Sequence, residues 1–362
     1  MDSIRSYFEP HKGGKVTLGI DGFVDEVWQI VSLRKSDTDY DLHNSMTNFA
    51  KSVYDSGEGG YTSETVRKRR IYGGFTGNTG SAVGALGFDL SMVGFFGNNS
   101  IDSAFSKFEG SHKMYSLGEP GICNIFEFED GKLMLPFTDS VSGVKWEDIV
   151  KSPSYDAISK AYMEADIVGL GYWFLLRNFD ELVTKLYENL LIKGKCSRLF
   201  LDFADIRKRD EKALLDTLKT LSGFGQKIPM TLSLNEHEGA HLFSCMEKSM
   251  SLSDPESVAK DIEYVRQQTG LDEVIVHTPY FAVGASASEG VETVLQDYCE
   301  NPVITTGAGD NFNGGYTAAS ARKGELTFKE RLLVANAVAG FYVKNGHSPC
   351  SAKLLNELSR KR

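Results

Sequence analysis

Short apolar runs alternate along the chain with amphipathic stretches of helical length. The apolar runs have the length and β-branched content of buried strands. They include Lys15–Ile20, Leu90–Phe96, Ala165–Gly171, Arg198–Ala204 and Glu273–Thr278. The amphipathic stretches repeat apolar residues every three or four positions and predict helices, as in Phe179–Leu191 and Phe328–Val343. Strands that alternate with helices predict an α/β fold, with a mostly parallel central sheet and helices on both faces.

The most informative stretch runs from Pro302 to Gly315. Pro302–Thr306 is short and β-branched and predicts a buried strand end, and the small residues Gly307–Gly309 then lead into a helix. Such a turn leaves unpaired N–H groups at the helix N-terminus, which suit the charge on a transferring phosphoryl group. Asp310 would repel a resting phosphate, but it can accept the proton of an attacking hydroxyl. The alternative is a plain Gly-rich turn with a helix-capping Asp.

The residues of this turn resemble a known signature. Gly307-Ala308-Gly309-Asp310-Asn311-Phe312-Asn313-Gly314-Gly315 is similar to the C-terminal motif of the ribokinase-like (PfkB) carbohydrate kinase family. The resemblance implies that Gly307, Ala308 and Gly309 form the anion hole and that Asp310 is the general base. It also implies a ribokinase-like fold, and it extends from Leu18 to Pro349.

A second group of residues is expected to bind the sugar. Gly73-Gly74-Phe75-Thr76-Gly77-Asn78 matches the family's GGxxxN element, and Asp25, with Asp21 as second choice, matches the Asp that follows the first strand. A Gly pair lets backbone N–H groups approach a ligand, and an Asn side chain offers a donor and an acceptor to a vicinal diol. The resemblance therefore implies that Asp25, Asp21, Gly73, Gly74 and Asn78 bind substrate. Without it, two solvated turn carboxylates and a close helix–sheet contact would be the simpler interpretation.

A third group is expected to bind the nucleotide. Asn235 and Glu238 match the family's NxxE motif, which implies that they arrange Mg²⁺ through its waters; the same pattern also fits a helix cap. The resemblance further implies nucleotide contacts from Thr278, Thr305 and Asn336. The chain departs from the family after the strand at Glu273–Thr278, where Pro279 replaces a flexible Gly and removes an N–H donor.

The resemblance also gives a candidate K⁺ site near Ile304, Thr306, Gly346 and Ser348. In many family members, the segment before the anion-hole turn and the turn after the last long helix form a monovalent-cation site. Several members have an Asp where this chain has Ile304. A backbone carbonyl would then have to replace the missing carboxylate.

The family also carries a lid over the sugar, and two segments fit it. Residues around 25–72 are polar, with a helical stretch near Met46–Tyr54, and residues around 118–137 hold two apolar runs about the hairpin signal Glu129-Asp130-Gly131. Ile122, Asn124 and Phe126 share one face of the first run and are candidates to line the pocket. The basic run 67–70 is interpreted as a solvated face. Lid strands often pair between subunits in this family, which implies a homodimer.

Composition narrows the partners and the compartment. The chain has 362 residues and a net charge of −10, so a nucleic-acid partner is not expected. No segment approaches the ~20 apolar residues of a membrane span, and the first residues lack a secretory pattern. The five cysteines are scattered and lack CxxC spacing, which suits a reducing compartment. We therefore expect one cytoplasmic α/β kinase domain over residues 1–362.

These features together favour an ATP-dependent sugar kinase that uses Mg²⁺ and acts on a small carbohydrate. Two alternatives stay open. A nucleoside kinase of the same family would need an aromatic base pocket, for which Phe23, Trp28 and Phe126 are candidates. A catalytically silent protein that senses a sugar or nucleotide would tolerate the departures at Pro279, Ile304 and Asn98-Asn99.

Overall fold

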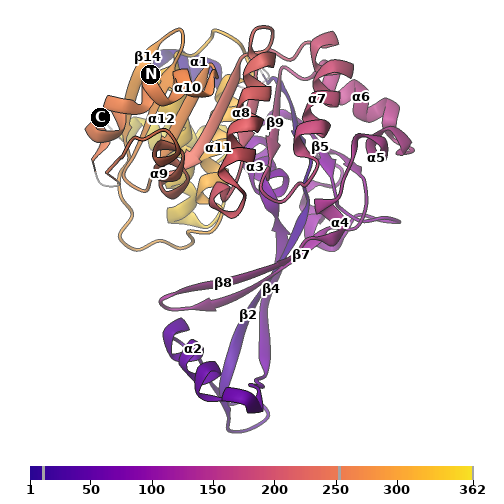
Figure 1. Ribbon diagram of the computed structural model, residues 1–362, viewed down its shortest axis with the longest axis vertical. Helices are drawn as coiled ribbons and strands as arrows, with labels where there is room; N and C mark the ends of the chain where they lie inside the picture. Colours follow the sequence, from indigo (N-terminus) through magenta and orange to yellow (C-terminus); the bar gives the residue numbers. More distant parts are fainter. Residues whose placement is uncertain (10–12, 252–253, 361–362) are drawn as a thin grey trace.

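The computed structural model describes residues 1–9, 13–251 and 254–360. Its main body is built on a nine-stranded sheet in which seven neighbouring strands are parallel and two at one edge are antiparallel (Figure 1). In spatial order the strands are β14 (Gly290–Leu295), β13 (Phe281–Ser286), β12 (Glu273–His277), β11 (Met230–Asn235), β10 (Leu199–Asp202), β9 (Ile167–Gly171), β1 (Lys15–Gly19), β5 (Asp89–Gly94) and β6 (Lys113–Ser116).

Helices cover both faces of this sheet, because its strands are apolar on both sides. Along β12, Val274 and Val276 join one buried cluster, whereas Ile275 between them joins the other. The first cluster is completed by α5 (Trp146–Lys151), α6 (Tyr155–Glu164), α7 (Phe179–Asn189), α8 (Glu211–Gly225), α9 (Glu236–Cys245) and α10 (Pro255–Thr269). The second is completed by α1 (Asp2–Tyr7), α3 (Gly74–Ala85), α11 (Ala308–Ser320), α12 (Phe328–Asn345) and α13 (Ser351–Arg360).

A second, five-stranded sheet projects from the main body and forms the lid (Figure 1). Its strands are β2 (Phe23–Arg34), β3 (Tyr40–Leu42), β4 (Thr65–Gly73), β7 (Gly121–Phe128) and β8 (Gly131–Phe137). The helix α2 (Met46–Asp55) lies beside the β7–β8 hairpin, where Asp130 Oδ1 accepts the N–H of Met46 at 2.6 Å. The short helix α4 (Asp139–Ser142) follows the lid.

Three helices that carry the candidate motifs pack unusually closely. A Cβ on Gly314 of α11 would lie 2.5 Å from the Cβ of Ala82 on α3, and a Cβ on Gly315 would lie 3.0 Å from Val338 of α12. Glycine at these positions lets the helices approach until their backbones nearly touch. The N-terminal turns of α3 and α11, which hold the GGxxxN and GAGD motifs, are thereby brought together.

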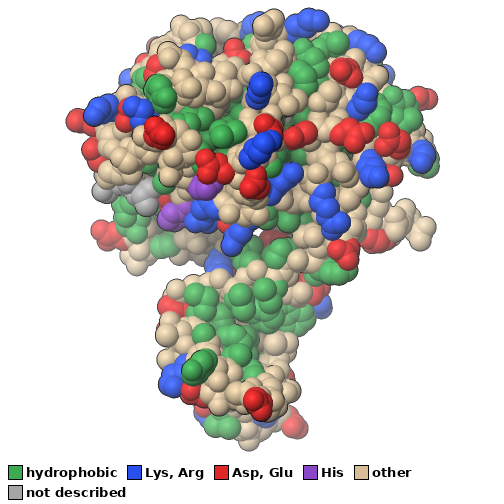
Figure 2. Space-filling view, viewed as in Figure 1, with side chains coloured by type: hydrophobic (Ala, Val, Ile, Leu, Met, Phe, Trp, Pro, Cys, Tyr) green, Lys and Arg blue, Asp and Glu red, His purple; other side chains and the backbone are tan. Residues whose placement is uncertain are grey.

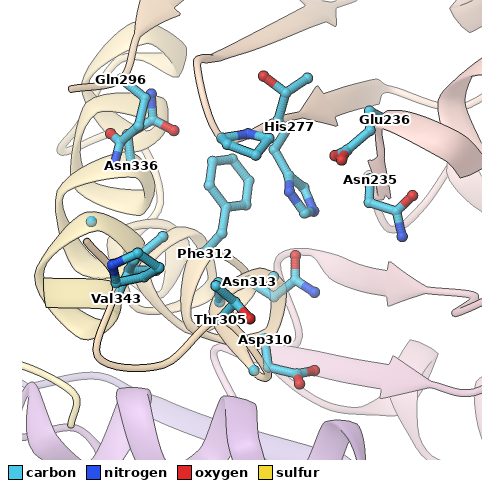
Figure 3. A pocket seen from close by; sticks show the side chains of 18 of the residues that line it. Asn235, Glu236, His277, Gln296, Thr305, Asp310, Phe312, Asn313, Asn336 and Val343 are labelled. Atoms are coloured by element: carbon cyan, nitrogen blue, oxygen red, sulfur yellow. The ribbon is translucent and has the colours of Figure 1, made fainter. Parts of the chain in front are cut away.

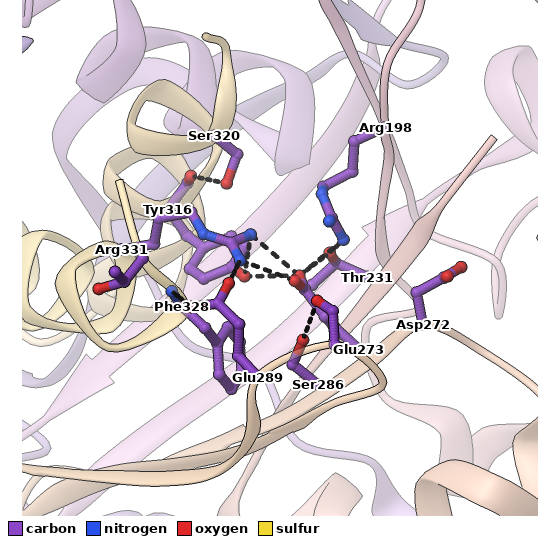
Figure 4. A network of polar contacts seen from close by, with 12 residues as sticks. Arg198, Thr231, Asp272, Glu273, Ser286, Glu289, Tyr316, Ser320, Phe328 and Arg331 are labelled. Carbon is purple, nitrogen blue, oxygen red and sulfur yellow. Dashed lines mark hydrogen bonds and ion pairs between the residues drawn. The ribbon is translucent and has the colours of Figure 1, made fainter. Parts of the chain in front are cut away.

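A buried ion-pair network fixes α11 and α12 against the sheet (Figure 4). Glu273, only 1% exposed, pairs with Arg198 at 2.7 Å and with Arg331 at 2.8 Å, and accepts the Tyr316 hydroxyl at 2.6 Å. Burial opposes the charge on Glu273, but the two arginines outweigh it and lower its pKa. Tyr316 belongs to α11, so this network positions the helix whose first turn carries Asp310.

The expectation of a strand at Pro302–Thr306 is wrong. The segment is an irregular loop in which Val303 is 67% exposed, and its N–H groups reach back to the carbonyl of Val343 at the end of α12. Pro302 has no N–H to give to a ladder, and the exposed Val303 has no neighbouring strand against which to pack. The helix after it forms as expected, from Ala308 to Ser320.

Candidate active site

Two cavities meet at the carboxyl ends of the parallel strands. The larger, of about 520 Å³, is lined from β9, β10, β11, β12, α11 and α12, and the smaller, of about 150 Å³, lies between the lid, α3 and α11. Asp310 lines the larger cavity and Asn78 lines the smaller one. Asn78 Nδ2 donates to Asp310 Oδ2 at 3.1 Å, so the two cavities border each other at this pair.

Asp310 sits at the third position of α11 and lines the larger cavity (Figure 3). Burial raises its pKa well above the usual range, and the nearby carboxylates of Asp202, Asp21 and Asp25 raise it further. The hydrogen bond from Asn78 acts in the opposite direction. A carboxyl group whose pKa is raised in this way is a stronger base once it is ionised, as a proton acceptor needs to be.

The turn before Asp310 is held from behind by a chain of hydrogen bonds. Gly307 caps α11 with φ at +85°, and a Cβ there would lie 3.1 Å from the Tyr342 hydroxyl, so the position requires glycine. Asn311 Nδ2 donates to the Gly307 carbonyl at 2.9 Å, and Ser348 Oγ donates to Asn311 Oδ1 at 2.8 Å. The N–H groups of the first helical turn have no partner within the helix. Those of Gly309 and Asp310 therefore form a preorganised donor site for an anion.

The predicted sugar residues converge beside the smaller cavity. Asp25 lines it, and a Cβ on Gly73 would lie 2.3 Å from Asp25 Oδ1. Asp21 is fully buried behind Gly74, where an added Cβ would lie 2.3 Å from its Oδ2, and Oδ1 accepts the N–H of Thr76 at 2.8 Å. Asp21 Oδ2 is buried without a hydrogen-bond partner. Burial raises the pKa of both carboxyl groups to about 6.

Asn235 and Glu238 face the larger cavity, but they also cap α9. Asn235 Oδ1 accepts the N–H of Glu238 at 3.0 Å, and Glu238 Oε2 accepts the N–H of Asn235 at 2.9 Å. Burial raises the pKa of Glu238 to about 9, and the carboxylate of Asp202 adds to the shift. Among the described residues, no three His, Cys, Asp or Glu side chains are grouped closely enough to chelate a metal. Asn235 and Glu238 therefore form the helix cap and also line the cavity, so the cap alone does not decide between the two interpretations of the NxxE motif.

The other predicted nucleotide residues also line the larger cavity. Asn336 is buried on α12 and donates to the Val294 carbonyl at 3.2 Å, and Thr305 lies in the exposed loop before the turn. The Thr278 hydroxyl accepts the N–H groups of Tyr280 and Phe281, both at 3.0 Å, so it is engaged in its own turn. That engagement makes a phosphate contact from the Thr278 hydroxyl less favourable than the sequence suggested.

Cationic side chains of the lid and of the segment that follows β5 lie in or beside the smaller cavity. Lys132 on β8 hydrogen-bonds to Thr306 Oγ1, one residue before the anion-hole turn. Arg69 lines the cavity and pairs with Glu127 at 3.0 Å, and Lys107 donates to Ser81 Oγ at 2.7 Å. Arg69 therefore does not belong to a merely solvated basic run. The expectation that Ile122, Asn124 and Phe126 line the cavity is wrong as well, because the opposite face of β7 turns toward it, through Ile125 and Glu127.

Comparisons with known proteins agree with this fold. A family model for prokaryotic ketohexokinase matches residues 2–360. The chain belongs to the prokaryotic ketohexokinase family. A ketohexokinase from Haloferax volcanii is 28% identical over 353 residues, 96% of this chain and 92% of that protein. Arabidopsis thaliana ribokinase complexed with ribose and ATP has a TM-score of 0.62 at 18% identity, covering 96% of this chain and 99% of that one. An E. coli protein described as a putative ribokinase II, in complex with ATP and Mg²⁺, gives 0.62 at 15%, with coverage of 96% and 99%.

Membership of the prokaryotic ketohexokinase family confirms two predictions from the sequence: the ribokinase-like fold and the function of an ATP-dependent sugar kinase. It also bears on the nucleoside-kinase alternative. None of Phe23, Trp28 and Phe126 is among the described residues that line either cavity. Phe23 is buried with its ring centroid 5.6 Å from that of Tyr172, and Trp28 donates to Asn124 on the lid. The aromatic base pocket proposed from these three residues does not form.

The site contains residues to which sequence reasoning gave no role. Asp202 ends β10, and its Oδ2 accepts Asn313 Nδ2 at 2.6 Å, while burial raises its pKa to about 6. A carboxylate at the end of a predicted strand was a usable signal, because ligands of α/β sheets bind at that edge. His277 ends β12 in the same way. No local signal marks Lys132, because it contacts Thr306 from a position 174 residues away in the sequence.

Proposed function

We propose that this protein transfers the γ-phosphate of ATP to a hydroxyl group of a ketohexose. The hydrogen bond between Asn78 and Asp310 is the observation that carries the proposal, because it sets a sugar-sized cavity beside one large enough for a nucleotide at a single proton acceptor. The ketohexose is suggested by the family and by the Haloferax volcanii relative. We regard residues 1–362 as one kinase domain with lid segments near 25–72 and 118–137.

In the proposed mechanism, the smaller cavity holds the sugar, and Asp310 and the turn before it carry out the transfer. Asp25, Asp21, Gly73, Gly74 and Asn78 hold the sugar, with Asp25 and Asn78 accepting or donating directly to its hydroxyl groups. Asp310 takes the proton of the attacking sugar hydroxyl. The oxygen of that hydroxyl forms a bond to the γ-phosphorus, and the bond between the γ-phosphorus and the ADP oxygen breaks. The N–H groups of the Gly307–Gly309 turn and of α11 stabilise the charge on the transferring group.

The larger cavity supplies the nucleotide side of the proposal. Thr278, Thr305 and Asn336 border the nucleotide, with the Thr278 hydroxyl kept in its own turn. Asn235 and Glu238 hold water molecules of Mg²⁺ through the acceptor positions that their capping bonds leave free. When bound, Mg²⁺ neutralises phosphate charge and orients the phosphoryl group. This chain keeps the acceptors in place through the α9 cap.

A coupled assay of ADP release tests the proposal. We expect turnover with MgATP and a ketohexose, and much less with aldohexoses or nucleosides. Asp310→Asn should reduce kcat by roughly 10²–10⁴-fold, the usual contribution of a general base, while calorimetry still detects ligand binding. Unchanged turnover in Asp310→Asn would remove Asp310 as the base, and turnover on nucleosides alone would replace the substrate class.

K⁺ activation forms a separate part of the proposal. Ile304, Thr306, Gly346 and Ser348 all line the smaller cavity, so the two loops expected to bind a monovalent cation do come together. The Thr306 carbonyl already accepts the Tyr342 hydroxyl at 2.8 Å, and the Ser348 hydroxyl donates to Asn311. A K⁺ ion would have to share these oxygens. Turnover that rises in KCl over choline chloride at equal ionic strength would support the site, and equal turnover would remove it.

We further propose that the lid pairs with the lid of a second copy of the chain. Hydrophobic side chains gather on the lid in Figure 2. Several lid residues expose large apolar side chains, including Leu33, Ile71, Met134, Leu135 and Phe137 at 39–59% exposure. Apolar patches of this kind often mark protein interfaces. Light scattering on the intact protein should give the mass of a dimer, and Phe137→Asp should shift it to that of a monomer.

No helix within residues 1–9, 13–251 and 254–360 is long and apolar enough to span a bilayer.

A further inference from the structure

One side chain in the larger cavity has no role in the proposed mechanism. His277 is the last residue of β12 and lines the cavity beside Asn235, Glu236 and Asp310 (Figure 3). Its imidazole lies on the ring of Phe312 from α11, with centroids 4.5 Å apart and planes 25° from parallel. The strand and the stacked ring fix the imidazole plane, so its polar edge has a defined direction.

That edge points at the anion-hole turn. A Cβ on Gly309 would lie 3.3 Å from His277 Cε1 and 3.9 Å from Nε2. Because Gly309 has no side chain, the Nε2 edge of the ring and the main-chain donors of the turn border the same space. Within the described residues the imidazole has no hydrogen-bond partner, whereas the side chains of Asn235, Glu238 and Asn313, from the same cavity lining, each have one.

The ring is also kept uncharged, because burial lowers the pKa of His277 to about 4. A neutral imidazole has one N–H donor and one acceptor, so it offers a directed hydrogen bond and not a full positive charge. The cavity therefore presents a fixed neutral donor where phosphoryl oxygens are expected.

We propose that His277 Nε2 donates a hydrogen bond to a phosphoryl oxygen of the bound nucleotide, next to the N–H groups of Gly309 and Asp310. This role rests on the proposed function, since it needs the nucleotide phosphates to lie at the anion-hole turn. The role also compensates for the donor that the chain loses at Pro279. Where Pro279 removes one backbone donor and Thr278 is engaged in its own turn, His277 supplies a donor from the same segment.

Two substitutions distinguish a phosphate donor from a packing residue. His277→Gln places an amide near the former Nε2, whereas His277→Asn reaches only the former Nδ1. We expect His277→Asn to raise the Kd for ATP by about 10–100-fold, as expected for losing a hydrogen bond to a charged group, and to leave the Kd for adenosine unchanged. His277→Gln should recover much of the loss. His241→Gln, the same exchange on α9 outside both cavities, should change neither value.

Calorimetry with ATP, ADP and adenosine, without sugar, makes this test independent of turnover. Equal weakening for ATP and adenosine, or full ATP affinity in His277→Asn, would overturn the proposal and leave His277 as a packing residue. Melting temperatures identify variants that misfold. If both do, the imidazole ¹⁵N signals of the wild-type protein should shift on adding ATP but not adenosine, and unshifted signals would overturn it. Absence of ketohexose phosphorylation by the wild-type protein would refute the proposed function alone.

Discussion

Replacing Asn78 with alanine should change how the activity depends on pH. Asn78 Nδ2 donates to Asp310 Oδ2 at 3.1 Å. That bond favours the ionised carboxylate, against burial and the charges of Asp202, Asp21 and Asp25, which all raise the pKa of Asp310. Removing the donor should raise this pKa further. Since a general base must be ionised to act, the acid limb of kcat/KM should move to higher pH.

The size of the effect follows from the bond that is lost. A hydrogen bond to a charged group contributes roughly 1.5–3 kcal/mol, and each 1.36 kcal/mol changes a protonation equilibrium tenfold. On the acid limb, where the base is mostly protonated, kcat/KM should therefore fall by about 10–100-fold. Well above the limb, where Asp310 is ionised in both proteins, only the loss of sugar contacts by Asn78 should be seen.

Steady-state kinetics with saturating MgATP across the pH range would measure both effects. Thr79→Val is a suitable control, because the Thr79 hydroxyl donates to the Asp310 carbonyl at 3.3 Å and not to its carboxylate. It should leave the acid limb in place. A loss in Asn78→Ala that is equal at every pH would refute the reasoning, because it would show that Asn78 acts through sugar binding alone.

Three further predictions concern the frame of the site. Gly74→Ala should abolish sugar binding in a thermal-shift assay, because its Cβ would lie 2.3 Å from Asp21 Oδ2 and φ is +78°, whereas Gly59→Ala, with open space around it, should have no effect. The pKa of Asp21 is raised from 3.8 to about 6, so the folded state binds more protons and stability from this group falls as pH rises through that window. Asp21→Asn should remove this pH-dependent loss of stability, which urea unfolding should measure as roughly 1–3 kcal/mol. An unchanged slope of the free energy of unfolding against pH would contradict the assignment. Glu273→Gln should lower the free energy of unfolding by about 3–5 kcal/mol, since it leaves two arginines without their carboxylate, and a loss under 1 kcal/mol would show that the network is dispensable.

The sequence predicted the parts of the site that follow from local chemistry. The small-residue turn before Asp310 and the Gly pair before Asn78 each begin a helix, and they were recognisable because glycine is needed where a backbone must approach a ligand. The NxxE motif could not separate a helix cap from a metal-arranging pair, since Asn235 and Glu238 make the cap and face the cavity as well. Both interpretations required the same residues at the same spacing.

What the sequence could not predict depends on neighbours distant along the chain. Pro302–Thr306 has the composition of a strand, but β14 already ends that edge of the sheet, and the segment packs instead against the end of α12. The pocket-lining face of β7 was misassigned because alternation identifies two faces without showing which one turns inward. The contact of Lys132 with Thr306 likewise depends on how the lid is placed over the body.

The glycines of α11 determine how closely the neighbouring helices bring their site residues to Asp310. Gly314 and Gly315 bring α3 and α12 against α11. Asn78 is thereby carried to Asp310, and the Tyr342 hydroxyl to the Thr306 carbonyl beside the anion-hole turn. A proton acceptor and an anion hole on one helical turn can act together only if sugar and nucleotide reach that turn from opposite sides. Helix packing at these glycines therefore fixes how closely the two cavities approach each other. Gly314→Ala should therefore separate Asn78 from Asp310 and lower kcat without changing any group that contacts either substrate.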